Sequence, residues 1–168
     1  MQYQYYMFEI IVIGVGVILV YIYVAHVVDY KILKEKHLKS KEWDLNISCG
    51  ETEIAKINAD IIKRDVNNFM LIEDVYNLPF KDNELNEVVS SHTIEHVDDP
   101  DRFFNELKRI SKNVTIILPP VWDLASVLWV LEHKWLFLTL KTKHVNKLPK
   151  KIKMPYDFVH KIIGQRIE

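Results

Sequence analysis

The sequence has one cysteine and four glycines in 168 residues, and each scarcity excludes a class of structure. A single cysteine, Cys49, excludes an intramolecular disulfide framework and a cysteine-based zinc cluster, and it suits a reducing compartment. Hydrophobic residues make up 49% of the chain and charged residues 27%, which excludes a disordered or collagen-like polymer. The length is that of one domain.

The net charge of −1 conceals an uneven distribution of charge along the chain. Residues 1–41 carry 5 basic and 3 acidic groups, and residues 107–168 carry 12 basic and 4 acidic groups. Between them, residues 42–106 carry 5 basic and 16 acidic groups. Such a division indicates parts of the chain with different surroundings.

An apolar segment lies near the N-terminus. Ile10–Val28 contains 19 consecutive residues without a formal charge, and as a helix it would be about 28 Å long, close to the thickness of the bilayer hydrocarbon. A buried core helix or a secretory signal peptide would be alternatives. A signal peptide begins with basic residues, whereas residues 1–9 contain no Lys or Arg. We therefore predict a short tail over 1–9 and a transmembrane helix over 10–28.

The charged residues on either side of this segment predict its orientation. Five lysines follow it closely and none precedes it. These lysines are Lys31, Lys34, Lys36, Lys39 and Lys41. The positive-inside rule therefore predicts a single-pass membrane protein whose C-terminal domain is cytoplasmic. We interpret residues 29–41 as a charged, helical connector.

After the connector, short β-rich runs alternate with turn and helix signals, which is typical of an α/β fold. The predicted strands are Leu45–Ile47, Ile57–Ile61, Phe69–Ile72, Glu87–Ser91 and Val114–Leu118. Before the last of them we predict a helix that begins with Asp98 or Asp99 as its cap and Pro100 at its first position. A strand, a crossover helix and a strand in this order form a right-handed parallel unit.

Polar residues follow the predicted strands where ligands bind in open parallel sheets, at the carboxyl ends. Gly50 comes directly after the first strand and suits a tight turn or a close backbone approach; by itself it is equally compatible with a plain turn. Asp60 at the tip of the second strand has the chemistry to accept hydrogen bonds from two ribose hydroxyls; by itself it is equally compatible with a surface acid.

Four segments in order resemble the class I S-adenosylmethionine-dependent methyltransferases, in particular their type 11 branch. They are Leu45–Glu51, Asn58–Ile61, Asp74–Asp82 and Ser90–Val97. The resemblance covers roughly residues 44–118. It implies a Rossmann-like, mostly parallel sheet of about five strands in the order 3-2-1-4-5, within a methyltransferase-like domain over 42–120 that follows one transmembrane helix.

The resemblance also implies S-adenosylmethionine as the cofactor and assigns residues to it. The Ser48–Glu51 loop would approach the methionine part, Asp60 the ribose, and Asp74 with Val75 the adenine. Ser91 and His92 would line the methyl-donor side. The implied cofactor-binding residues are Ser48, Cys49, Gly50, Glu51, Asp60, Asp74, Val75 and Ser91.

Methyl transfer from a sulfonium requires alignment of donor and acceptor and exclusion of water, and a hydroxyl or protonated amine acceptor also benefits from a general base. His92 follows the fourth strand and is the candidate base, with lining of the pocket as the alternative role. We interpret His96, beside Glu95, as a structural residue that orients its loop. His26, His37, His133, His144 and His160 show no metal-ligand grouping, so no metal site is predicted.

The C-terminal part, residues 121–168, is predicted as an apolar helix followed by a basic segment. Charges interrupt the apolar run Val121–Leu140 and cost about 2.5–3.5 kcal/mol each inside a bilayer, which argues against a second span and favours an interfacial helix. Six lysines then occur within thirteen residues, suited to an anionic leaflet. A helix that covers the sheet, followed by a solvated tail, is the alternative. We expect no nucleic-acid partner, because no aromatic residues interleave with the lysines.

The sequence is compatible with two functions. The first is S-adenosylmethionine-dependent methyl transfer to an unidentified acceptor, small or lipid-associated, with membrane lipids as partners. The alternative is a noncatalytic, membrane-tethered module for cofactor binding or assembly, derived from a methyltransferase.

Overall fold

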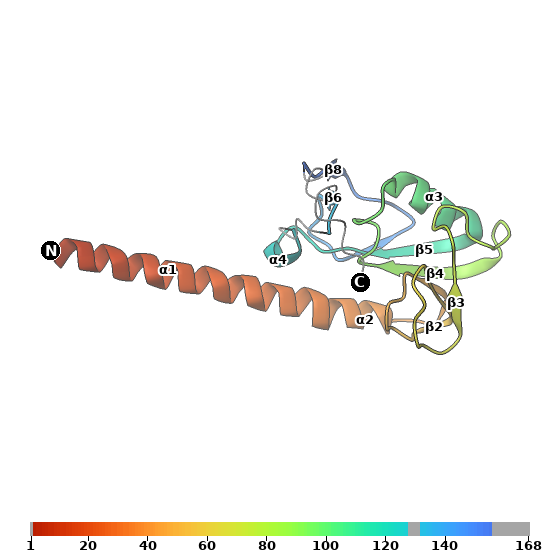
Figure 1. Cartoon of the computed structure of the whole chain (residues 1–168), viewed down its shortest axis with the longest axis horizontal. Helices are drawn as coiled ribbons and strands as arrows, with labels where there is room; N and C mark the ends of the chain where they lie inside the picture. The colour runs from red at the N-terminus through yellow and green to blue at the C-terminus, as the bar shows by residue number, and fades with distance from the viewer. Residues whose placement is uncertain (1, 128–131, 156–168) are drawn as a thin grey trace.

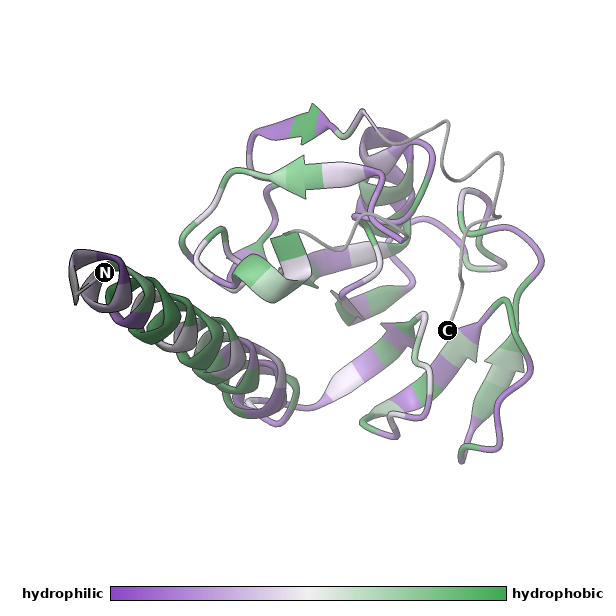
Figure 2. Ribbon diagram, turned by 60° about the vertical axis from the view of Figure 1, so that its left-hand side comes forward, coloured by the Kyte–Doolittle hydropathy of each residue, from purple (hydrophilic) through white to green (hydrophobic). Residues whose placement is uncertain are grey.

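The computed structural model describes residues 2–127 and 132–155. A long helix, α1 (Gln2–His26), begins at the N-terminal tip of the molecule and projects away from the domain (Figure 1). It continues without a break through the π-helix η1 (Val27–Leu33) and α2 (Lys34–Leu38). Most of the visible length of the projecting part is coloured hydrophobic in Figure 2, and by length and composition the helix is able to cross a membrane. The predicted helix over 10–28 lies within it.

Within the described ranges, the central sheet has six strands in the order β3-β2-β1-β4-β5-β7, which confirms the predicted order 3-2-1-4-5 and adds one strand. The strands are β1 (Trp43–Ile47), β2 (Ala55–Asp60), β3 (Phe69–Leu71), β4 (Leu85–Ser91), β5 (Ser111–Ile117) and β7 (Lys143–Val145). The first five pair in parallel, and β7 runs antiparallel to β5. All five predicted strands are present.

One face of the sheet is covered by α3 (Pro100–Ile110). The Asp99 side chain caps this helix by accepting a hydrogen bond from the Arg102 N–H at 3.0 Å, and Pro100 fills the first position as predicted. Phe103 and Leu107 from the inner face of α3 are fully buried in the main core. Because α3 connects β4 to β5, it forms the predicted crossover.

The C-terminal end of the long helix, α2, packs on the face of the sheet opposite α3. Leu38 lies in a second core cluster with Trp43, Val89 and Ile117. The Trp43 indole N–H donates a hydrogen bond to the Leu38 carbonyl at 2.6 Å, in a buried position. The connector is therefore part of the folded domain as well as a charged link.

The prediction of an apolar helix from residue 121 to residue 140 is wrong. The described part of this run contains only the short helix α4 (Leu124–Val127) and the strand β6 (Trp135–Phe137). β6 pairs antiparallel with β8 (Lys151–Lys153), and Phe137 turns into the main core. Strand pairing with sequence-distant partners thus determines this structure, which local hydropathy does not predict.

The predicted basic segment is also partly structured, because β7 and β8 each contain lysines from it. Met1 and residues 128–131 and 156–168, which include Trp129 and His160, lie outside the described residues.

Candidate functional site

The parallel pairing of β1 to β4 brings the loops that follow these strands to one edge of the sheet. Two non-glycine residues on this edge have left-handed backbone conformations: Ser48 after β1 with φ 56° and His92 after β4 with φ 52°. Such conformations are strained for residues with a side chain, and strained residues cluster at ligand sites. The carboxyl edge of the sheet, which the sequence predicts to be the ligand site, therefore also contains locally strained backbone.

Gly50 and Asp60 are joined at this edge, as the sequence analysis expected of neighbouring strand ends. The Gly50 N–H donates to Asp60 Oδ2 at 3.0 Å, and the Ile62 N–H donates to Asp60 Oδ1 at 3.1 Å. Gly50 has a φ of +54°, which glycine adopts without strain, and the space beside its Cα is open. The turn therefore needs glycine for its conformation, and it leaves room for a ligand.

A residue that the sequence analysis missed, Arg64, lies against the same carboxylate. Its Nε is 3.6 Å from Asp60 Oδ2. The Arg64 Nε and Nη2 atoms are buried and have no hydrogen-bond partner among the described residues. Nothing in the sequence pattern of the loop after β2 singles out this arginine.

The other predicted cofactor residues differ in exposure. Cys49 is buried, and its N–H donates to the Ala59 carbonyl at 3.0 Å, whereas Glu51 is exposed. Burial raises the pKa of the Cys49 thiol to about 11. Asp74 is exposed, its carboxylate accepts from the Tyr76 N–H at 2.8 Å, and it has no hydrogen bond to Gly50 or Asp60 in the described part of the chain.

Val75 is half-buried against the main core, and Ser91 ends β4. The Ser91 hydroxyl is buried and has no hydrogen-bond partner among the described residues.

His92 lies deep in the loop after β4, with 11% of its side chain exposed. Its Nδ1 is 3.7 Å from Glu95 Oε1, and its buried Nε2 has no hydrogen-bond partner in the described residues. Burial lowers the pKa of His92 well below its usual value, with a smaller contribution from the nearby charge of Lys34. The imidazole is therefore neutral at pH 7, and burial makes it a weaker base than a solvent-exposed histidine.

The C-terminal end of the long N-terminal helix, from here called the helix foot, packs against this histidine. The Tyr30 ring meets the His92 ring edge-on with centroids 5.4 Å apart, and His26 stacks on Tyr30 at 5.5 Å. His26 Nδ1 lies 3.1 Å from Asp123 Oδ2, and the fully buried Asp29 accepts a hydrogen bond from the Thr142 hydroxyl at 3.2 Å. The sequence does not predict these contacts, because residues 29–41 have the composition of a charged connector.

The segment after β3 is fixed to α3 by an acid and an arginine that the sequence analysis also missed. Glu106 accepts from the Leu78 N–H at 2.6 Å and from Arg109 at 2.6 and 2.8 Å. Arg109 in turn donates to the Leu78 and Phe80 carbonyls at 3.1 and 2.8 Å. These contacts explain structurally why the Leu78–Phe80 segment has a defined shape.

A family described as "methyltransferase domain" matches residues 30–118, which is more than half of the chain. The chain belongs to this methyltransferase family. No curated protein matches the sequence.

Several solved methyltransferases are similar to the chain in structure. One from Haloferax volcanii, solved in complex with a methyltransferase activator, is 17% identical, with 55% of this chain and 54% of that chain covered and a TM-score of 0.40. One from Aquifex aeolicus is 19% identical, with 55% and 66% covered and a TM-score of 0.36. One from Methanosarcina mazei is 17% identical, with 68% and 76% covered and a TM-score of 0.39. The chain spans about half the length of the first of these.

Membership of the family implies S-adenosylmethionine as the cofactor of this methyltransferase domain. The residues at the carboxyl edge have suitable chemistry, since the open space at Gly50 adjoins a carboxylate that accepts hydrogen bonds. By contrast, a hollow of about 420 Å³ lies at the opposite edge, near the amino ends of β1 and β2, and is lined by Trp43 and Ala55 among others. That hollow is remote from the predicted cofactor residues.

Proposed function

We propose that this protein transfers a methyl group from S-adenosylmethionine to an acceptor held at a membrane surface, with His92 as the candidate base. The observation that carries the proposal is the contact between Tyr30 and His92. It joins the foot of the apolar helix to the strand edge that carries the predicted cofactor residues. An acceptor that reaches this edge would do so beside α1.

The reaction is an in-line displacement. A lone pair of the acceptor atom forms the new bond to the methyl carbon while the carbon–sulfur bond breaks, and its electron pair stays on sulfur to give S-adenosylhomocysteine. The positive charge on sulfur disappears, and the acceptor loses a proton to a base. The protein contributes mainly by alignment and exclusion of water, for which the buried, neutral His92 beside Tyr30 is suited.

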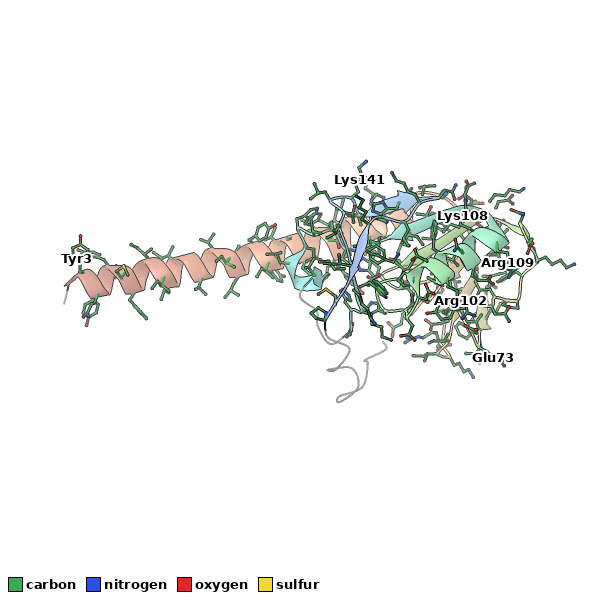
Figure 3. All side chains as sticks on the ribbon, turned by 90° about the horizontal axis from the view of Figure 1, so that it is seen from above. Tyr3, Glu73, Arg102, Lys108, Arg109 and Lys141 are labelled. Atoms are coloured by element: carbon green, nitrogen blue, oxygen red, sulfur yellow. The ribbon has the colours of Figure 1, made fainter. Side chains whose placement is uncertain are left out.

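Contacts between the helix and the domain support a position near the bilayer. The Tyr21 hydroxyl donates to the Trp122 carbonyl at 3.0 Å, so the domain reaches α1 within its last two turns. Leu138 and Leu140 expose 51% and 73% of their surface near this end, and Lys141 follows them. Figure 3 shows Lys141 at the end of the domain nearer α1, with Glu73 at the far end. Exposed leucines beside lysines are suited to an anionic interface.

Calorimetry with S-adenosylmethionine on the detergent-solubilised full chain tests the cofactor site. Asp60→Ala removes charge-assisted hydrogen bonds, and we expect it to weaken binding by about 1–3 kcal/mol, or roughly 5–150-fold. Asp65→Ala, an exposed acid five positions later, is the matched control. Equal affinities of the two variants would remove Asp60 from the cofactor site.

Transfer of labelled methyl groups tests the reaction. The full chain is incubated in nanodiscs with methyl-labelled cofactor and membrane extract, and the products are separated into lipid, protein and small-molecule fractions. We expect label in the lipid fraction. Label confined to water-soluble products would refute the membrane-surface part of the proposal, and cofactor binding without any transfer would refute the enzyme.

A noncatalytic, cofactor-binding module is the second candidate, and one observation favours it. The protein's own side chains already lie against Asp60, the proposed cofactor ligand, and His92, the proposed base. Arg64 Nε is 3.6 Å from the Asp60 carboxylate, and the Tyr30 ring lies beside His92. Binding in calorimetry together with no transfer of label is the result that this candidate predicts.

A further inference from the structure

Behind His92, the chain brings together a carboxylate and two imidazoles that are distant in sequence. Glu95 and His96 lie in the loop after β4, and His133 comes from the stretch before β6. One ligand atom from each of these three residues lies within 4.8 Å of the other two. The sequence pattern shows no metal-ligand grouping for His133, because 37 positions separate it from His96.

The Glu95 side chain has unusual surroundings for a carboxylate. The residue is 1% exposed, and neither carboxylate oxygen has a hydrogen-bond partner among the described residues. The basic side-chain atoms within 4.0 Å of it are His92 Nδ1 at 3.7 Å and His96 Nε2 at 4.0 Å, and no Lys or Arg forms an ion pair with it in the described part of the chain. A buried carboxylate without hydrogen bonds is strongly destabilising unless it is neutralised or binds a cation.

The imidazoles of the cluster present lone pairs rather than positive charge. His96 Nδ1 is 3.1 Å from the Glu132 carbonyl, which only accepts, so Nδ1 carries the proton and Nε2, the atom nearer Glu95, presents a lone pair. His133 is buried, with 8% of its surface exposed. The two rings meet edge-on with centroids 4.8 Å apart.

Backbone contacts hold the two segments together. The N–H groups of Lys134 and Trp135 both donate to the Glu95 carbonyl, at 2.9 and 3.1 Å. The Glu132 carbonyl, 3.1 Å from His96 Nδ1, orients the His96 ring. Carbonyl groups that orient ligand histidines in this manner are the usual outer support of a metal site.

We propose that Glu95, His96 and His133 bind a divalent transition-metal ion, with Zn²⁺ as the most suitable ion. One carboxylate and two neutral imidazoles are a donor set for Zn²⁺ and related ions, whereas Mg²⁺ and Ca²⁺ prefer oxygen ligands alone. In a tetrahedral zinc site the ligand atoms are about 3.3 Å apart. The side chains therefore approach one another by up to roughly 1.5 Å when the ion binds.

This site goes beyond the proposed function and does not depend on it, because metal binding requires neither cofactor nor acceptor. Three protein ligands leave a coordination position for water or for an oxygen of a second molecule, as in catalytic zinc sites. His92 lies beside that set, since it contacts Glu95.

The test uses the full chain in detergent, purified without a polyhistidine tag and treated with chelator. Co²⁺ is titrated into it and followed by visible absorption, and Zn²⁺ is then used to displace Co²⁺. We expect one equivalent of Co²⁺ with the intense bands of a four- or five-coordinate site. We also expect Glu95→Gln and His133→Gln to lower Zn²⁺ affinity by at least about 10-fold, the lower bound for even an outer-sphere partner.

His37→Gln is the matched control, because His37 lies on α2, outside the cluster, and the variant should retain wild-type affinity. Circular dichroism establishes that each variant is folded. X-ray absorption at the zinc edge of the loaded wild-type protein needs no variant, and we expect nitrogen and oxygen ligands including two imidazoles. Absence of stoichiometric metal binding, a sulfur ligand from Cys49, or unchanged affinity in both folded cluster variants would overturn the proposal.

Discussion

Replacement of Glu106 by glutamine should loosen the segment that follows β3. Glu106 is 9% exposed and accepts three hydrogen bonds, from the Leu78 N–H and from two nitrogens of Arg109. Glutamine keeps the shape of the side chain, but it removes the charge and turns an amide donor toward the Arg109 donors. Removal of one partner of a buried pair costs about 3–5 kcal/mol. Because 34% of the Arg109 side chain is exposed and is rehydrated, we expect a smaller loss of about 2 kcal/mol.

The change should be visible in thermal unfolding of the full chain in detergent. For a domain of this size, a loss of about 2 kcal/mol lowers Tm by roughly 5–10 °C. Glu73→Gln, at an exposed site, is the control and should stay within about 0.5 kcal/mol of the wild type. Hydrogen exchange of the Leu78 amide should accelerate in Glu106→Gln only.

The pH dependence of the free energy of unfolding provides a second test of the role of Glu106. The hydrogen bonds from Arg109 hold the pKa of Glu106 below its usual value. The stabilisation is therefore present above the unfolded-state pKa of about 4.3 and is lost as pH falls through the folded value. The difference in stability between wild type and Glu106→Gln should narrow below about pH 4.3. A Tm equal to that of the wild type at pH 7 would refute the reasoning.

Three further predictions concern other parts of the molecule. The Cys49 thiol, with its pKa raised to about 11 by burial, should react with iodoacetamide at pH 8 roughly 100-fold more slowly than a free cysteine of pKa about 8.5, and labelling at the free-cysteine rate in the folded protein would contradict this. Trp43→Phe removes the donor to the buried Leu38 carbonyl and should lower the unfolding free energy by about 1–3 kcal/mol in denaturant titrations, whereas an unchanged value would show that α2 does not depend on this bond. In a Cys49→Ser background and in anionic nanodiscs, an environment-sensitive fluorophore at Leu140→Cys should emit at shorter wavelength than one at Glu73→Cys; equal emission would exclude contact of the Leu140 region with the membrane.

Local sequence signals predicted the parts of the fold that local chemistry determines. Runs such as Ile116–Leu118 are apolar on consecutive positions, as buried parallel strands require, and Asp99 with Pro100 fixes the start of α3. Gly50 and Asp60 were identified because Gly50 follows a strand and Asp60 ends one, and parallel pairing brings such strand ends together. The approach of these two residues therefore followed from topology alone.

The parts that were missed depend on contacts between distant segments. β6 and β8 are three residues long and contain charged or amphipathic residues, so their hydropathy does not distinguish them from a helix or a tail. Tyr30 belongs to a segment whose composition is that of a connector, and only the packing of the helix foot places it beside His92. His133 meets Glu95 and His96 because the segment before β6 folds back onto the β4 loop.

The location of the cofactor is tested most directly by hydrogen–deuterium exchange of the full chain in detergent, with and without S-adenosylhomocysteine. The account predicts slower exchange in peptides that contain residues 48–51 and 60–64, at the carboxyl ends of β1 and β2. Slower exchange only in peptides from the opposite edge, around residues 53–56 beside the hollow, would contradict it, as would exchange that saturating ligand leaves unchanged throughout.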